Sequence, residues 1–275
     1  MKIYYSNIAS IKNEKETFPN VGVLISYYGL KELNRPIFCN SLFLDSGAFS
    51  AWSQNVEINI DEYIHFVKKN KRNIDIIASL DNIKSYEKSL NNYFIMKDND
   101  LKILPTYHYG EPFWVIEEYI KYTNYIALGG IAKIHKQERI KWLNNVFSKF
   151  WNTEIKFHGF GIQDRKILLK YPWHSVDSSS AHVMARFGGI CTPWGDFKIN
   201  PEVNYKDLKW ISPLSEARIK EWVENQMGVD YESAKRGTVE GTNQRIKINV
   251  KYYEQLSKKN SKEIFNIKGQ RGLFL

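Results

Sequence analysis

The feature that most constrains this chain is a repeated order of short apolar runs, polar or glycine-bearing turns and amphipathic stretches. Seven runs rich in β-branched and aromatic residues are typical of strands: 22–29, 41–45, 74–81, 101–108, 125–130, 155–161 and 173–177. Amphipathic helical stretches lie between them at 61–70, 112–122, 136–150 and 163–171. Continuous apolar strands that alternate with helices predict a parallel sheet covered on both faces.

Seven such units predict an α/β fold, a closed (β/α)8 TIM barrel, with an open doubly wound sheet as the alternative. The segment GGICTP (188–193) is the candidate for the eighth strand. After about residue 205 the pattern contains helices only, at 215–227 and 242–259. We therefore expect a catalytic barrel over residues 1–205 and a helical extension over 206–275 that packs on it.

Polar residues and glycines gather where the predicted strands end. These strand-end residues are Asp45, Asp81, His108, Gly129, Gly130, His158, Gly161 and Asp177. In a barrel such ends meet at one mouth, where active sites are built. A single aspartate there is often only a helix cap or the start of a turn. Three of them, with histidine and paired glycines, indicate a site built on carboxylates.

The segment LFLDSGAFSAW (42–52) is the most specific of these strand ends. Asp45 follows three apolar residues, so its burial is costly unless the carboxylate is hydrogen-bonded or used in chemistry. Ser46 and Gly47 allow a tight turn with small side chains, which leaves room for a ligand. The alternative is a structural turn in which Asp45 caps a helix.

The net charge favours a polyanionic partner. The chain has 39 Lys and Arg against 30 Asp and Glu, a formal charge of +9. Lys136, Arg139, Arg165 and Lys166 follow the strand-end motifs and are candidates for contacts with nucleic acid. The alternatives are a Lys-rich proteome and ordinary exposed helix faces.

Neither a metal nor a disulfide framework is expected. Cys39 and Cys191 are the only cysteines, they are far apart, and no His or Cys spacing is typical of a metal site. No run reaches about 18 apolar residues, and the start of the chain has no apolar signal region. We expect no cofactor, no contact with a membrane and a cytoplasmic location.

DSGAFS (45–50) resembles the DSGGFQ motif of the tRNA-guanine transglycosylases and their relatives that place 7-deazaguanines in DNA. Similar segments follow in the family's order: SLD (79–81), YHYG (107–110), YIALGGIA (125–132), HGFGIQD (158–164) and HSVDSSSA (174–181). The resemblance covers roughly residues 40–190, and the ordered set is more specific than any one motif.

This resemblance implies a role for each matching residue. Asp177 is the expected nucleophile that attacks C1′ of a nucleotide, and Asp45 the general base that contacts the nucleobase. Asp81 is expected to read the base edge together with His108, which stands where the family has Gln. The other residues expected to bind a free guanine or 7-deazaguanine base are Ser46, Gly47, Phe49, Gly129, Gly130, Ile131 and Gly161.

The chain also departs from the family's pattern. No cysteine follows Cys191, so the zinc site of the tRNA enzymes, three Cys and one His, cannot form. Ala48 and Ser50 replace the motif's second Gly and its Gln, and the chain has little room for a tRNA-binding module. A compact phage-type member that acts on DNA is therefore the favoured prediction, with tRNA as the alternative substrate.

The residue types suit this chemistry without the family. Departure of a base builds positive charge on the sugar, which one carboxylate can trap while a second manages the proton. Phe49, Trp52, Tyr107 and Tyr109 are candidates to stack on an extruded base, or else core residues. His158 and His174 are candidates to support the mouth. Two other functions stay open: a glycoside hydrolase, although no Glu ends a predicted strand, and a non-catalytic barrel that binds nucleic acid.

Overall fold

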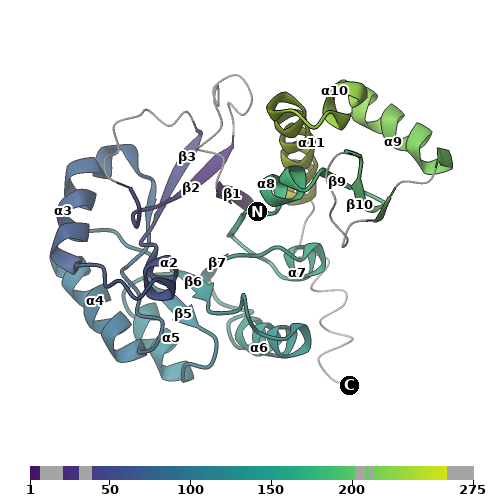
Figure 1. Cartoon of the computed structure of the whole chain (residues 1–275). Helices are drawn as coiled ribbons and strands as arrows, with labels where there is room; N and C mark the ends of the chain where they lie inside the picture. Colours follow the sequence, from purple (N-terminus) through teal and green to yellow (C-terminus); the bar gives the residue numbers. More distant parts are fainter. Residues whose placement is uncertain (7–20, 31–38, 202–208, 211–212, 259–275) are drawn as a thin grey trace.

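The computed structural model describes residues 1–6, 21–30, 39–201, 209–210 and 213–258 (Figure 1). Its centre is a curled sheet of eight parallel strands, with helices around the outside. The strands are β1 (Lys2–Ser6), β2 (Gly22–Ser26), β3 (Ser41–Asp45), β4 (Ile76–Ile77), β5 (Thr106–His108), β6 (Tyr125–Gly129), β7 (Lys156–Gly159) and β8 (Ser175–Ser178).

The strand order closes the sheet on itself. The order is β4-β3-β2-β1-β8-β7-β6-β5, so the first and last strands of this sheet in chain order, β1 and β8, pair in its middle. A parallel bridge between Ala78 and Leu104 joins the two outer strands. It is made by hydrogen bonds from Ser79 N to Leu104 O (2.9 Å) and from Leu104 N to Ile77 O (2.7 Å). The predicted (β/α)8 barrel is confirmed. Between β4 and β5 the sheet is closed by this bridge.

The prediction for the eighth strand is wrong. The missing strand is β1, whereas Gly189–Thr192 forms β9 outside the barrel. β9 turns back through Pro193 and Trp194 and pairs antiparallel with β10 (Gly195–Lys198). Thr192 Oγ1 donates to Gly195 O across this turn (2.8 Å). A tight hairpin commits β9 to an antiparallel neighbour, and this excludes it from an all-parallel barrel.

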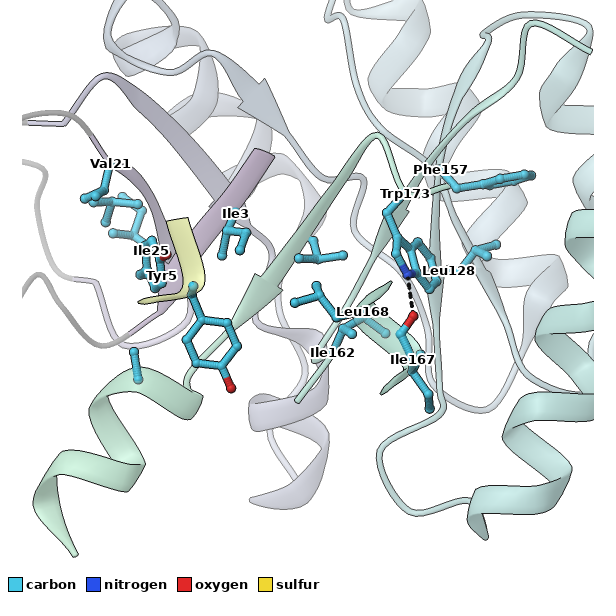
Figure 2. Close-up of a cluster of buried hydrophobic side chains, with 14 of the residues drawn as sticks. Ile3, Tyr5, Val21, Ile25, Leu128, Phe157, Ile162, Ile167, Leu168 and Trp173 are labelled. Carbon is cyan, nitrogen blue, oxygen red and sulfur yellow. Dashed lines mark hydrogen bonds between the residues drawn. The ribbon is translucent and has the colours of Figure 1, made fainter. Parts of the chain in front are cut away.

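The barrel has two apolar layers, as its alternating strands require. Inside lies a small cluster from successive strands: Tyr4, Leu24, Phe43, Ala78, Leu104 and Ala127. The larger core lies between the sheet and the helices. Part of it is drawn in Figure 2, where Trp173 packs near Phe157 and donates from Nε1 to Ile167 O (3.2 Å).

Helices follow the strands at the intervals that the sequence predicts, and polar side chains cap several of them. Around the barrel lie α2 (Ala48–Ser53), α3 (Ile60–Asn70), the short 3₁₀ helix η2 (Lys71–Asn73), α4 (Tyr86–Asp98), α5 (Phe113–Ile120), α6 (Lys136–Lys149), α7 (Arg165–Lys170) and α8 (Ser180–Arg186). Asn59 caps α3 by accepting from Asp61 N and Glu62 N, and Asp164 caps α7 by accepting from Lys166 N.

The segment after residue 205 is not purely helical, because β11 (Lys209–Trp210) pairs with β10 before α9 (Pro213–Asn225), α10 (Tyr231–Lys235) and α11 (Val239–Ser257). Two buried polar side chains join α11 to the barrel end. Arg245 Nε donates to Ala185 O (2.9 Å), and Asn249 accepts from Cys191 N (2.7 Å) and donates to Ala181 O (3.0 Å). Residues 259–275 of the expected extension lie outside the described residues.

No helix in the described part of the chain is long and apolar enough to cross a membrane.

Candidate active site

Three carboxylates meet at the mouth of the barrel. Asp45 ends β3, Asp177 lies in β8, and Asp81 follows the segment that bridges β4 to β5. Burial raises the pKa of Asp45 to about 7, and the charges of Asp81 and Asp177 add to the shift, although backbone hydrogen bonds from Gly47 and Ser46 oppose it. Asp45 is therefore poised between its two protonation states near neutral pH.

The turn after β3 presents the Asp45 carboxylate to the mouth. Gly47 has a left-handed backbone (φ 78°), and its N–H donates to Asp45 Oδ2 (3.2 Å). A Cβ on Gly47 would lie 2.2 Å from Ser26 Oγ and 2.5 Å from Tyr28 Cβ. Only glycine fits this turn, for reasons of both conformation and space.

Asp177 is held by donors from two other strand ends. Gly161 N–H donates to Asp177 Oδ1 (2.7 Å), and the Ser6 hydroxyl donates to Asp177 Oδ2 (3.4 Å). His158 Nε2 lies 3.6 Å from Asp177 Oδ1. The side chain of Asp177 is 12% exposed, so the carboxylate is fixed by protein but still reaches the mouth.

Asp81 belongs to a second polar group. His108 Nε2 lies 2.9 Å from Asp81 Oδ2 and His108 Nδ1 lies 3.1 Å from Glu111 Oε1, while Ser46 Oγ donates to Asp81 Oδ1 (3.0 Å). Burial lowers the pKa of His108, but hydrogen bonds to Asp81 and Glu111 outweigh it and bring the pKa to about 10. His108 is therefore an imidazolium between two carboxylates at neutral pH.

The glycine pair after β6 makes room for this histidine. A Cβ on Gly129 would lie 2.9 Å from Thr106 Cγ2 and 3.1 Å from His108 Cδ2. Gly129 O accepts from Tyr109 N (3.0 Å), so it is used within the barrel. Ile131 is 2% exposed and belongs to the core. The predicted residues Gly129 and Gly130 thus border the Asp81–His108 pair.

Aromatic residues beside the mouth divide into surface and core. Phe49 and Trp52 lie on α2 with ring centroids 5.8 Å apart, and Phe49 is 47% exposed. Lys133 Nζ lies 5.5 Å from both ring centroids, and Lys84 Nζ lies 5.8 Å from that of Trp52. We call Phe49, Trp52, Lys84 and Lys133 the aromatic platform. A pocket of about 420 Å³ lies next to it and is lined by Trp52, Asp81 and Lys84.

Of the two alternatives for Tyr107, a residue that stacks on a base or a core residue, the structure supports the core residue. Tyr107 is 1% exposed, its ring stacks on Trp142, and its hydroxyl donates to Glu111 O (2.7 Å). Tyr109 is half-buried and also packs on Trp142. Both side chains therefore support the loop after β5.

The four predicted basic residues line one pocket. Lys136, Arg139, Arg165 and Lys166 surround a space of about 550 Å³, together with Ser180, which follows Asp177 by three residues. Lys136 pairs with Asp164 (2.6 Å), and Arg165 pairs with Asp196 (2.9 Å). Among the described residues neither Arg139 nor Lys166 has an ion pair. We call this space the basic pocket; it carries surplus positive charge beside β8.

A pocket of about 670 Å³ lies at the opposite end of the barrel, where β4, β5 and β6 begin, which we call the closed end. His174 lies at that end too, against the ring of Tyr125, so its predicted place at the mouth is wrong. The pocket's two acidic residues, Asp75 and Asp100, are exposed, and Asp75 accepts from Leu42 N (2.7 Å). We place the active site at the mouth, because Asp45, whose pKa is raised by burial and by the charges of Asp81 and Asp177, lies there.

The sequence prediction missed several residues of the site. Glu111 and Ser6 were not candidates, and His158 was expected only in support. Glu111 has a local clue, since it follows His108 by three residues in YHYGE. Ser6 has none, because the pairing of β1 with β8, which brings it to Asp177, is not visible in the local sequence.

Within the described residues, no group of three or more His, Cys, Asp or Glu side chains could hold a metal ion. Neither a protein-family model nor a curated protein matches this chain.

Proposed function

We propose that the protein exchanges a base at an N-glycosidic bond of nucleic acid, replacing guanine with a 7-deazaguanine base. The observation that carries this proposal is the mouth itself, where Asp45 has a pKa of about 7 beside Asp177, a carboxylate held by fixed donors. Two carboxylates in such different surroundings suit a proton carrier and a nucleophile.

The reaction has two balanced steps. In the first, an Asp177 oxygen forms a bond to C1′, the bond from C1′ to the base nitrogen breaks with its electron pair on the base, and protonated Asp45 gives the base a proton. In the second, ionised Asp45 takes a proton from the entering base, whose nitrogen attacks C1′ and releases Asp177. Asp45 begins and ends in the same protonation state.

Asp81 and His108 are suited to recognising the base. Asp81 offers its carboxylate oxygens as acceptors to the polar edge of a purine-like base, and His108, whose two N–H groups face Asp81 and Glu111, holds that carboxylate in place. The adjacent Gly130 is exposed, so its backbone is accessible from this side. Binding of a base that lacks the matching donors would leave acceptor oxygens of Asp81 unpaired and out of water. That cost would exclude such a base.

Nucleic acid is the proposed partner, with DNA favoured over tRNA. The aromatic platform and the basic pocket border the mouth, which suits a strand whose target nucleotide is extruded between them. DNA is favoured because no cysteine follows Cys191 in this sequence, so these residues offer no counterpart of the tRNA enzymes' zinc site.

The test is incubation of the protein with duplex DNA, or separately with bulk tRNA, and radiolabelled guanine or 7-deazaguanine precursors. We expect label in DNA with the wild type and none with Asp177→Ala. Label in tRNA alone would keep the chemistry and change the substrate. Binding without incorporation into either would support a non-catalytic barrel, and release of sugar from simple glycosides without added base would support a glycoside hydrolase.

A further inference from the structure

A line of polar side chains runs through the barrel interior to Asp177. The Tyr125 hydroxyl lies 2.5 Å from Ser175 Oγ, and Ser175 Oγ lies 2.6 Å from His158 Nδ1. His158 Nε2 then faces Asp177 Oδ1 at 3.6 Å. The residues come from three adjacent strands, β6, β7 and β8, and their register holds His158 beside Ser175.

His158 is enclosed by apolar rings. It is 0% exposed, and its ring centroid lies 4.7 Å from those of Phe43 and Phe160 and 6.2 Å from that of Tyr4. Burial lowers the pKa of His158, which the nearby Asp177 offsets only in part. Asp177 is the only charged group that faces it from these elements. His158 is therefore neutral and carries a single N–H.

The hydrogen-bond chain determines where that proton lies. If Nδ1 carried it, the Nε2 lone pair would face a carboxylate with no other partner, because Nε2 is buried and unpaired among the described residues. If instead Tyr125 donates to Ser175 and Ser175 donates to Nδ1, every hydroxyl is used and Nε2–H faces Asp177 Oδ1. The second arrangement turns a donor, and not a lone pair, toward the Asp177 carboxylate at 3.6 Å. Hydrogen bonds of this kind are often long before substrate binds.

We infer that His158, through a neutral Nε2–H, is a positioning residue that orients the Asp177 carboxylate; this inference rests on the proposed function. Gly161 N–H and His158 both face Oδ1, whereas among the described residues Oδ2 accepts from the Ser6 hydroxyl alone, at 3.4 Å. Oδ2 is then the atom that bonds to C1′, and Oδ1 becomes the carbonyl oxygen of the sugar ester. Because the imidazole is neutral, it orients the carboxylate without protonating it.

The first test needs no activity. Imidazole ¹⁵N–¹H correlation spectra of the wild-type protein report the tautomer of His158, assigned with His158→Gln. We expect the Nε2–H tautomer in the wild type and a shift of its proton resonance in Asp177→Asn. An Nδ1–H tautomer, a doubly protonated ring at neutral pH, or no response to Asp177→Asn would overturn the inference, whatever reaction the protein catalyses.

The second test is kinetic. We expect His158→Phe to lower kcat for base exchange by up to about 100-fold, because a misplaced nucleophile is costly, with KM for the free base unchanged. His158→Gln keeps an N–H donor and should recover most of that loss. The matched control is His174→Phe, at the other end of the barrel, which should leave kcat unchanged. Full kcat in a folded His158→Phe protein, or no recovery with Gln, would contradict the positioning role, whereas a wild type without exchange activity would count against the proposed function instead.

Discussion

The two ends of the barrel differ, because the end with the larger pocket is not the end where the carboxylates gather. The closed end has the larger pocket, about 670 Å³, but its acidic residues Asp75 and Asp100 are exposed, and Asp75 accepts from Leu42 N on a neighbouring strand. The mouth has smaller pockets, and there the half-buried Asp45 lies near Asp81 and Asp177 with a pKa of about 7. Keeping charges of one sign together out of water is unfavourable, so their presence indicates function more strongly than volume does.

The largest expected effect is on the rate of exchange. Asp177→Asn should lower it by at least about a thousandfold, because the amide cannot act as the nucleophile. Asp75→Asn, the matched change at the closed end, should leave the rate unchanged. Label incorporation into DNA measures both, and thermal unfolding checks that both variants are folded. Equal losses of exchange rate in Asp177→Asn and Asp75→Asn would contradict the placement of the active site at the mouth.

The next effect is on the pH dependence of stability. The carboxyl of Asp45 keeps its proton up to a pH of about 7 in the folded protein, but loses it near 3.8 when unfolded. The wild type should therefore lose stability as the pH rises from about 4 to about 7. Asp45→Asn cannot ionise, so above pH 7 its free energy of unfolding should exceed that of the wild type by roughly 1–3 kcal/mol.

Urea unfolding at pH 5 and pH 8 measures this difference. The control is Asp75→Asn, whose pH dependence should follow the wild type. If Asp45→Asn is less stable than the wild type at pH 8, burial and the nearby carboxylates do not raise the pKa of Asp45. The description of the mouth would then be wrong.

A smaller effect is expected on strand binding. Trp52→Ala in the aromatic platform should weaken single-stranded DNA binding by about 1 kcal/mol, since a base loses its stacking surface. The matched control is at the closed end, where Tyr122 is 48% exposed and Lys97 Nζ lies 4.8 Å from its ring. Tyr122→Ala should bind like the wild type. Equal weakening in the two variants, measured by fluorescence anisotropy, would show that the platform is not part of the binding surface.

The smallest effect concerns the basic pocket. Lys166→Ala should lower the slope of log K against log salt by about one, with the same loss for every DNA sequence, because a phosphate contact carries no sequence information. Lys102→Ala, an exposed lysine at the closed end, should leave the slope unchanged. An unchanged slope in Lys166→Ala would show that the DNA strand does not contact the basic pocket through Lys166.

The sequence predicts the parallel barrel well because each buried strand is a continuous apolar run with a helix after it. It fails for β9, since GGICT is as apolar as a barrel strand, and the turn at Pro193 and Gly195 is the only local sign of a hairpin. The sequence prediction also misses β1, because KIYYS is short and has a polar residue at each end. Tyr4 faces into the barrel and Tyr5 packs outside it. Successive residues of a strand point to opposite faces, and both faces are buried because the sheet curls into a barrel.

The candidate site shows the same division. Asp45, Asp81 and Asp177 are visible because each ends an apolar run, and the four basic residues because they begin two helices. The partners that tune them are not visible. Ser6 and His158 come to Asp177 through strand pairing, and the proton on His158 depends on Ser175 from a third segment. Such contacts depend on three-dimensional register, which local sequence does not encode.

The most direct test of the central claim is to trap the covalent intermediate. The protein is incubated with DNA, quenched with acid, digested and analysed by mass spectrometry. We predict a sugar ester on the peptide that contains Asp177, absent from Asp177→Asn and lost when free base is added before the quench. Exchange without any adduct, or an adduct on Asp45, would contradict the account.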